Sequence, residues 1–278
     1  MTSSVSTPPL LLAGIDFSSN PSRKKPIIVA LGHLGGPVVK LARLEAFATL
    51  DAYAAWLATP GPWLGAFDFP FGLPRAFVEA NGLGATCEEV IQQVRARCPT
   101  RMQWRSFIDA WGNTQPAGQR LLHRRTDTAL QGLSSTSPLQ TRYVPVGFMY
   151  YEGVARLIDA GVTLPQMHAG DPARVAVEGY PGLLAHELIG RRSYKNKDEP
   201  ERLIARKEMM DALEQGRSTR LGLRLRLTHA QRDHVIDDAS GDRLDAVLCL
   251  MQAAWASTRP GWGSPDGIDP VEGWIVSA

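Results

Sequence analysis

The sequence lacks the features that mark membrane, secreted or fibrous proteins. No apolar run among its 278 residues approaches the roughly 18 residues that a membrane helix needs. The first nine residues carry no basic residue, which argues against a secretory signal. The three cysteines show no metal-type spacing and predict reduced thiols in a cytoplasmic protein. With 44% hydrophobic and 21% charged residues, the composition is globular and excludes disordered, collagen-like and coiled-coil proteins.

Two common nucleotide-binding motifs are also missing. The chain contains neither GxxxxGK[ST] nor GxGxxG, so no phosphate loop or dinucleotide fingerprint is expected. Its six histidines are scattered, and no His or Cys pair has the spacing of zinc ligands. The net charge of +2 is uninformative, but residues 91–226 hold 21 Lys and Arg against 13 Asp and Glu. Such asymmetry is typical of a phosphate-attracting surface beside a cation site, and also of ordinary solvated helices.

The hydrophobic pattern predicts an α/β protein, because strand-like runs alternate with helical ones. Strands are expected at residues 10–17, 26–31, 38–44, 63–69 and 174–178. Helices are expected at residues 50–57, 153–160, 181–189, 201–215 and 242–256. Residues 75–145 differ, since helical pieces at 87–97 and 103–111 alternate with polar loops rich in arginine. We therefore expect a flexible arm over residues 1–9 and one domain over 10–278, with a helical insertion at about 75–145.

Three of the predicted strands end on a carboxylate. These are Asp16 in LLLAGIDFSS, Asp68 in LGAFDFPFGLP and Glu178 in RVAVEGYP. A single acid at such a position is usually structural. Three in one chain favour a site, because strand ends of an α/β sheet gather at the crevice where ligands bind.

Two further acids open the last predicted helix. Asp242 and Asp245 lie three residues apart and so share one face of that helix. Both could instead interact with the positive end of the helix dipole. That explanation suits Asp242 better than Asp245, which has apolar neighbours on both sides. Several converging carboxylates repel one another unless a cation neutralises them, and their hard oxygen atoms suit Mg²⁺ or Mn²⁺.

Four segments carry a resemblance to a known family. The segments GIDFSS, FDFPFGLP, EGYPGLL followed by SYKN, and GDRLDAVLCLMQAAWA resemble the family known as domain of unknown function 429. That family is regarded as predicted nucleases of ribonuclease H-like fold. The resemblance implies a mixed sheet of about five strands with helices on both faces and the Arg-rich insertion. A more distant resemblance to Holliday-junction resolvases of the RuvC type rests on Asp16, Asp68 and the pair of Asp242 and Asp245.

The family resemblance also implies roles for these acids. Asp16, Asp68, Glu178 and Asp245 would be metal ligands, and Asp242 would be a fifth catalytic acid. In the generic ribonuclease H layout the second acid ends the fourth strand, as Asp68 does here, and an acid on a fifth strand is extra. Glu178 and Asp242 would complete or orient the ligand shell.

Several basic residues are candidates for phosphate contacts. Lys195 lies in SYKN, and Arg202 follows it with Arg206 on the same helical face. We expect Lys195 and Arg202 to contact phosphate, although a solvated loop and helix face explain them as well. Two further basic runs suit either contact with a nucleic-acid backbone or interdomain packing with salt bridges. One run contains Arg95, Arg97, Arg101 and Arg105 together with Trp104, and the other is His123-Arg124-Arg125.

The expected function is metal-dependent hydrolysis of phosphodiester bonds in DNA or RNA, with Mg²⁺ or Mn²⁺ as cofactor. Two alternatives stay open. Ribonuclease H-like folds include sugar kinases and actin-like ATPases, in which strand-end acids hold Mg·ATP or act as base. The other alternative is a non-catalytic nucleic-acid-binding or scaffold protein that retains the acids.

Overall fold

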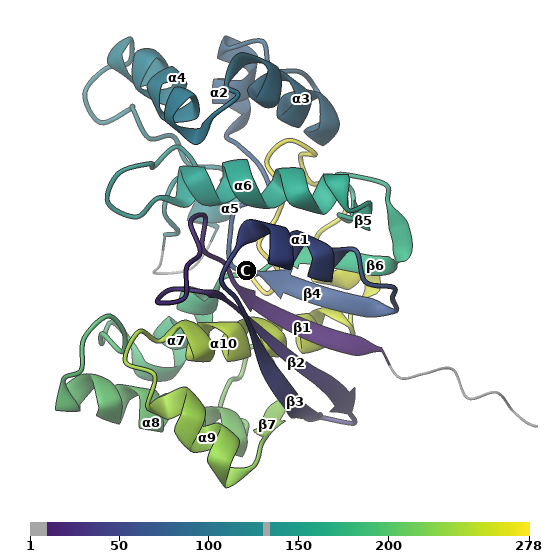
Figure 1. Cartoon of the computed structure of the whole chain (residues 1–278), viewed down its shortest axis with the longest axis vertical. Helices are drawn as coiled ribbons and strands as arrows, with labels where there is room; N and C mark the ends of the chain where they lie inside the picture. The colour runs from purple at the N-terminus through teal and green to yellow at the C-terminus, as the bar shows by residue number, and fades with distance from the viewer. Residues whose placement is uncertain (1–9, 130–133) are drawn as a thin grey trace, which may run out of the picture.

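A computed structural model describes residues 10–129 and 134–278 of the chain. The predicted arm at residues 1–9 lies outside the described residues. Seven strands form one mixed sheet in the order β5-β6-β4-β1-β2-β3-β7 (Figure 1). The strands are β1 (Leu11–Asp16), β2 (Ile27–Gly35), β3 (Val38–Phe47), β4 (Trp63–Phe67), β5 (Val162–Thr163), β6 (Asp171–Glu178) and β7 (Arg224–Arg226).

The strand directions bring three strand ends to one edge of the sheet. β1, β2 and β3 form an antiparallel meander, whereas β1, β4 and β6 run parallel to one another. In register, Ile15 of β1 pairs with Phe67 of β4, and Phe67 pairs with Glu178 of β6. The predicted α/β class is confirmed. The sheet has seven strands rather than about five, because β5 and β7 are two and three residues long and too short to show a pattern.

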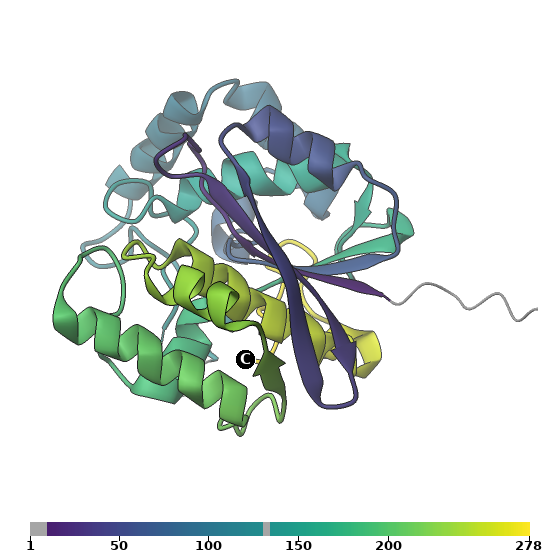
Figure 2. The ribbon, with the colours of Figure 1, turned by 60° about the horizontal axis from the view of Figure 1, so that its bottom comes forward.

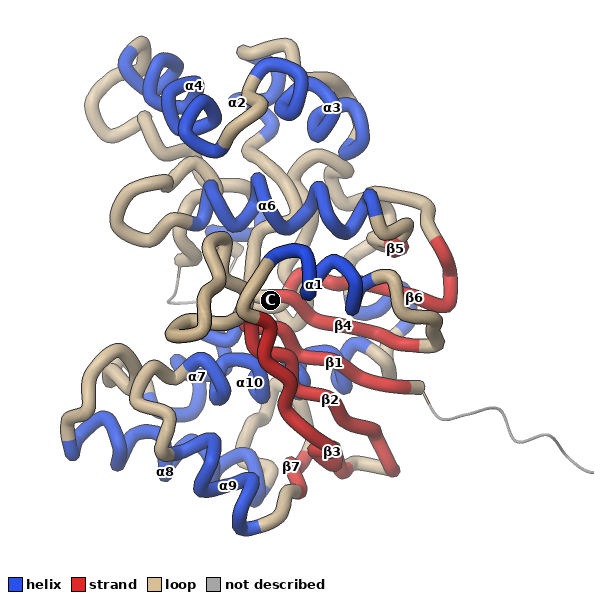
Figure 3. The backbone as a smooth tube through the Cα atoms, viewed as in Figure 1, coloured by secondary structure: helices blue, strands red, loops and turns tan. Residues whose placement is uncertain are grey.

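Helices cover both faces of the sheet (Figures 1 and 3). One face carries α1 (Leu50–Leu57) and α6 (Val146–Asp159). The other carries α7 (Pro181–Ile189), α8 (Pro200–Gln215), α9 (His229–Ile236) and α10 (Asp242–Ala256), as Figure 2 also shows. Each face has its own hydrophobic core, because successive residues of a strand point to opposite sides.

Helix α10 lies directly on β1, and Gly14 permits this close approach. A Cβ atom at Gly14 would lie 2.0 Å from the backbone nitrogen of Leu250 and 2.1 Å from the carbonyl oxygen of Ala246. No side chain fits at this point. The first turn of α10 is therefore held beside the end of β1.

The Arg-rich region between β4 and α6 is helical. It contains α2 (Arg75–Ala80), α3 (Cys87–Arg97), α4 (Arg101–Asn113) and α5 (Arg125–Thr128), of which α2, α3 and α4 lie at the top of Figure 1. Trp104 of α4 is fully buried, and its indole nitrogen donates to the carbonyl oxygen of Gly147 at 3.0 Å. This tryptophan is part of the core.

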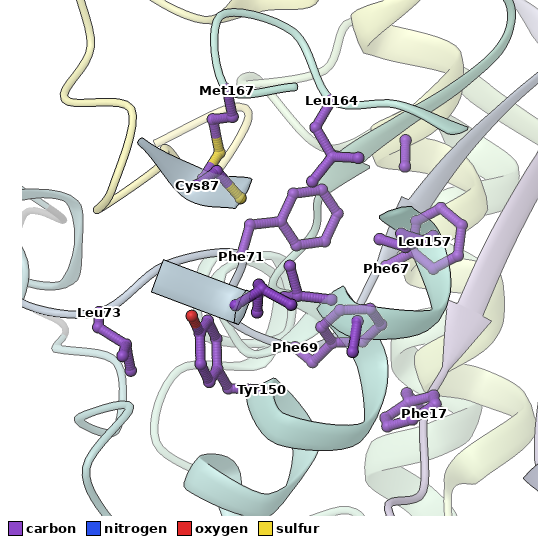
Figure 4. Close-up of a cluster of buried hydrophobic side chains, with 14 of the residues drawn as sticks. Phe17, Phe67, Phe69, Phe71, Leu73, Cys87, Tyr150, Leu157, Leu164 and Met167 are labelled. Carbon is purple, nitrogen blue, oxygen red and sulfur yellow. The ribbon is translucent and has the colours of Figure 1, made fainter. Parts of the chain in front are cut away.

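An aromatic cluster joins these helices to the sheet and fixes the segment that follows β4. Phe67, Phe69 and Phe71 are all buried, with ring centroids 5.8 Å apart for the first two and 5.3 Å for the last two. Figure 4 shows them among Phe17, Leu157 and Tyr150. Because alternate residues of this segment enter the core, Asp68 between them faces the opposite way.

The described residues include no helix that combines the length and the apolar character needed to cross a membrane. All three cysteines are buried and unpaired. A final short 3₁₀-helix, η1 (Pro260–Gly263), follows α10.

Candidate metal centre

Asp16 and Asp68 stand at the ends of adjacent parallel strands. Asp16 is the last residue of β1, and Asp68 directly follows β4. The backbone nitrogen of Asp68 donates to the carbonyl oxygen of Ile15 at 2.9 Å, which continues the strand pairing by one residue. Asp16 and Asp68 alternate with Ile15 and Phe67, whose side chains enter the core beneath α6. Both carboxylates therefore face α10.

Asp245, in the first turn of α10, completes the group. Its side chain is 1% exposed. One carboxylate oxygen from each of Asp16, Asp68 and Asp245 lies within 4.8 Å of the others. The structure thus brings together three of the acids that the sequence suggested as ligands.

Two side chains hold the Asp245 carboxylate. The Tyr194 hydroxyl donates to Oδ1 and the Lys195 ammonium donates to Oδ2, both at 2.5 Å. Tyr194 is buried, whereas the Lys195 side chain is 40% exposed. The Lys195 side chain therefore extends from the solvent to the buried carboxylate of Asp245.

Two arginines, Arg206 and Arg202, fix the segment that carries this tyrosine and lysine. Arg206, which is 1% exposed, donates to the carbonyl oxygens of Tyr194 at 2.8 Å and of Ile236 at 2.6 Å. Arg202 donates to the carbonyl oxygen of Lys195 and pairs with Glu199 at 2.8 Å. Both arginines of the predicted phosphate-binding face therefore bind the backbone of the segment that carries Tyr194 and Lys195.

Gly241 lets the same segment pass over the start of α10. Its φ of +82° is left-handed, and a Cβ atom there would lie 2.6 Å from Cβ of Lys195. Glycine is favoured at this N-cap for both reasons.

Burial and the neighbouring negative charges raise the pKa values of Asp16 and Asp68. Burial, followed by the charges of Asp245, Asp242 and Asp68, raises the pKa of the Asp16 carboxyl well above its ordinary value. Burial and the Asp245 charge raise the pKa of Asp68 to about 7. Burial opposes the charge of Lys195, but the neighbouring acids, Asp245 foremost, still raise the pKa of its ammonium. A positive charge among these acids therefore stabilises the site.

The structure does not place Glu178 within this group. Glu178 is in register with Ile15 and Phe67, so its side chain points to the α6 face and away from α10. The residue next to it, Gly179, has the α10-facing position, where a Cβ atom would lie 3.3 Å from Sγ of Cys249. Strand alternation thus separates Glu178 from the three Asp residues, although it borders the same pocket as Asp68.

Glu178 instead forms a buried ion pair with Arg124. The two Glu178 oxygens accept from Arg124 Nη1 at 2.7 Å and Nη2 at 2.6 Å, and Oε2 also accepts from the backbone nitrogen of Phe71 at 2.9 Å. Arg124 also donates to Asp127 and to the carbonyl oxygen of Glu272. Arg124, Asp127 and Glu178 are at most 3% exposed. This network joins α5, β6 and the C-terminal segment. It engages Arg124, one of the residues that the sequence analysis considered for contact with nucleic acid or for packing with salt bridges.

Asp242 lies at the rim of the centre. It is half-buried, and its charge contributes to the raised pKa of Asp16. Burial raises the pKa of Asp242 itself, and Lys25 opposes this. Neither Asp242 nor Asp245 caps α10, since Asp238 accepts from the backbone nitrogen of Arg243 at 3.0 Å. Both acids lie in the first turn of α10, so their positions are also compatible with the alternative interaction with the helix dipole.

The residues missed by the sequence analysis include a basic loop at this rim. Arg23, Lys24 and Lys25 are all exposed, and Lys25 is close enough to influence Asp242. Their signal was the RKK run seven residues after Asp16. Arginines of the insertion are engaged elsewhere: Arg95 pairs with Asp159, and Arg105 donates to the carbonyl oxygen of Thr141 at 2.6 Å. The packing explanation holds for these two.

Together, the sheet and the three convergent acids define an α/β protein with a candidate carboxylate metal centre. The model of the family described as Protein of unknown function (DUF429) matches residues 14–261. The chain belongs to this family, which confirms the resemblance noted in its motifs. The comparisons found no match among curated proteins or among solved structures.

Proposed function

We propose that this protein is a metal-dependent nuclease that hydrolyses phosphodiester bonds. The observation that carries the proposal is the convergence of Asp16, Asp68 and Asp245 from two strand ends and a helix, with ligand atoms within 4.8 Å. Such carboxylate groups recur at sites where divalent cations assist phosphoryl chemistry.

The donor set fits a hard divalent cation. All three side chains offer oxygen atoms, which Mg²⁺ and Mn²⁺ prefer. In an octahedral Mg²⁺ site, oxygens on opposite sides of the ion lie about 4.2 Å apart and neighbouring oxygens about 3.0 Å apart, so the three ligand atoms, which lie within 4.8 Å of one another, would draw closer around one ion. Burial and, after it, the charges of neighbouring acids raise the pKa values of Asp16 and Asp68. A divalent cation would relieve that repulsion.

The layout of the acids also supports the proposal. One acid ends the central strand β1, a second follows the adjacent parallel strand β4, and a third lies on the helix packed across them. This is the arrangement that the ribonuclease H-like resemblance implied for Asp16, Asp68 and Asp245. The same fold class includes sugar kinases and actin-like ATPases, so the layout alone does not choose the reaction.

Each residue of the site has a definite task in this proposal. When bound, the cation would supply positive charge to the phosphate and activate water for attack on phosphorus. Asp16, Asp68 and Asp245 would hold it, while Tyr194 fixes the Asp245 carboxylate through its hydroxyl. Lys195, partly exposed, would turn from Asp245 to a phosphate oxygen.

The exposed run at residues 23–25 would attract the substrate backbone. Its three side chains are open to solvent, and the charge of Lys25 acts on Asp242 at the rim of the centre. Lys and Arg at such a surface neutralise phosphates and release counterions, so binding should weaken with salt.

The test uses metal binding and cleavage as separate readouts. We expect Mn²⁺ to bind the wild-type protein by calorimetry, and the protein to cleave members of a panel of single-stranded, duplex and branched DNA and RNA. Asp16→Asn keeps the shape of the side chain but removes a ligand charge, so it should abolish cleavage and weaken Mn²⁺ binding. Asp266→Asn, on an exposed residue, is the matched control and should change neither.

Other outcomes would reject the proposal. A wild-type protein that binds no divalent ion and cleaves nothing would favour the scaffold alternative. Equal cleavage by wild type and Asp16→Asn would assign the activity to a contaminant or another site. Stabilisation by Mg·ATP in a thermal-shift assay, without cleavage, would favour the phosphotransferase alternative.

A further inference from the structure

A pocket of about 160 Å³ adjoins the metal centre. Asp68 and Lys195 belong to both. Its remaining walls come from the segment after β4, Arg124, residues 135–136, the start of α6 with the residues before it, the end of β6 with the turn to α7, and the C-terminal segment. Its apolar and aromatic lining residues are Phe69, Pro70, Val144, Val146, Met149, Tyr180 and Ile275.

The size of the pocket suits one planar ring. A cavity of about 150 Å³ lined by apolar side chains is known to accept benzene, so 160 Å³ can take a single ring system but not a stacked base pair. The Tyr180 ring and the Met149 thioether provide surfaces against which an aromatic ring packs well. The Tyr180 ring is itself held over Gly182, where a Cβ atom would lie 2.9 Å from it.

The Arg124 guanidinium, which lines the pocket, already has partners for all its donors. A guanidinium has five N–H donors. Those of Arg124 serve Glu178 twice, Asp127 twice and the carbonyl oxygen of Glu272 once. Arg124 therefore has no donor left for a ligand. An occupant would be held by packing rather than by this charge, which favours a flat apolar surface over an anion.

We propose that this pocket receives one unpaired nucleobase of the strand whose phosphate lies at Asp16, Asp68 and Asp245. The inference rests on the proposed nuclease function and narrows its substrate to single-stranded or locally unpaired nucleic acid. A base inside a duplex is stacked and paired, so it would have to leave the helix to enter. Since packing contacts are available to every base, the sequence preference should be weak.

The adjacency of pocket and acids supports the placement. Asp68 contributes its carboxylate to the metal centre and also lines the pocket, as does Lys195. A nucleotide whose phosphate meets Lys195 has its base within reach of the pocket. The mouth is accessible, because Val144 at its edge is 53% exposed.

Photocrosslinking tests the proposal without any need for catalysis. A single-stranded DNA oligonucleotide with one 5-iodouracil is irradiated with the wild-type protein in EDTA, and the adduct is mapped by mass spectrometry. We expect adducts on Tyr180, Phe69 or Met149. The same oligonucleotide annealed to its complement should give a much lower yield. Adducts found only on Tyr143, an aromatic residue 91% exposed outside this pocket, would overturn the proposal.

A filling variant provides a second, quantitative test. Val146→Trp places an indole in the pocket and should weaken single-strand binding about tenfold, as measured by fluorescence anisotropy. Tyr143→Ala is the control and should leave the affinity unchanged. If Val146→Trp folds poorly, as judged by thermal melting, the crosslink map of the wild type still decides.

Failure of this inference and failure of the nuclease proposal give different results. Crosslinks in the pocket without metal-dependent cleavage would keep the base site and reject the nuclease. Cleavage that depends on Asp16 but prefers duplex, with no crosslink in the pocket, would keep the nuclease and reject the base site.

Discussion

Substitution of Asp68 by asparagine should stabilise the metal-free protein at neutral and alkaline pH. The side chain keeps its shape but can no longer carry the charge that burial and Asp245 disfavour. Since one pKa unit corresponds to about 1.4 kcal/mol, a pKa displaced from 3.8 to about 7 corresponds to about 4 kcal/mol at full ionisation. Asp68 is partly exposed, and screening by solvent reduces this, so we expect about 1–3 kcal/mol.

The pH dependence has a definite sign. A carboxyl whose pKa is higher in the folded chain binds more protons there than in the unfolded chain. The Asp68 contribution therefore lowers stability as pH rises from 3.8 to about 7, and the loss persists above that range. The advantage of Asp68→Asn over wild type should be small near pH 4 and largest at pH 8.

Thermal melting in EDTA measures this advantage. At pH 8 the variant should melt about 2–5 °C above wild type, a range that follows from the expected free energy and the size of the chain. Added Mn²⁺ should raise the melting temperature of wild type more than that of the variant, because binding to the folded state stabilises it. Asp266→Asn is the exposed control and should change stability by at most about 0.5 kcal/mol. A destabilised Asp68→Asn, or an advantage equal at both pH values, would refute the reasoning.

Three further predictions concern packing, the buried network and the basic loop. Gly14→Ala should lower the free energy of unfolding by about 3 kcal/mol or more in chemical denaturation, because its Cβ would meet the backbone of α10. Gly35→Ala is the control and should be nearly neutral, because open space surrounds Gly35. Similar values for both variants would contradict the packing argument. Arg124→Met should cost about 3–5 kcal/mol by leaving two buried carboxylates unpaired, and a stability equal to wild type would show that the network is dispensable. Replacing all three basic residues at 23–25 by alanine should lower the salt dependence of single-strand binding, with a log–log slope smaller by about 2, and an unchanged slope would place the phosphates elsewhere.

The sequence alone determined the class of the fold and most of its elements. Apolar runs bounded by turns located β1, β4 and the end of β6, and helical periodicity located α1, α7 and α10. These signals are local, because they depend on which residues a single element must bury. The edge strands β5 and β7 and the helix α9 escaped notice, since short or weakly patterned segments are fixed by their neighbours.

The acids of the candidate site could be predicted in part from local sequence signals. Asp16, Asp68 and Asp245 were identified because a carboxylate that ends a buried strand, or lies on an apolar helix, stands out from its surroundings. Gly14 is a further local feature related to the convergence of these acids, because its lack of a side chain lets α10 approach β1. The sequence could not show that this glycine faces α10.

Only the tertiary structure decided the places of Glu178 and of the basic residues. Glu178 is one residue out of register with Asp16 and Asp68, and a shift of one residue turns a side chain to the other face of a sheet. Register depends on pairing between strands that are distant in the chain, so no local pattern reveals it. Likewise, Arg124 became a buried partner of Glu178 rather than a phosphate contact, because the insertion folds back over the end of β6. Charge is encoded in the sequence, but the partner that neutralises it is chosen by the fold.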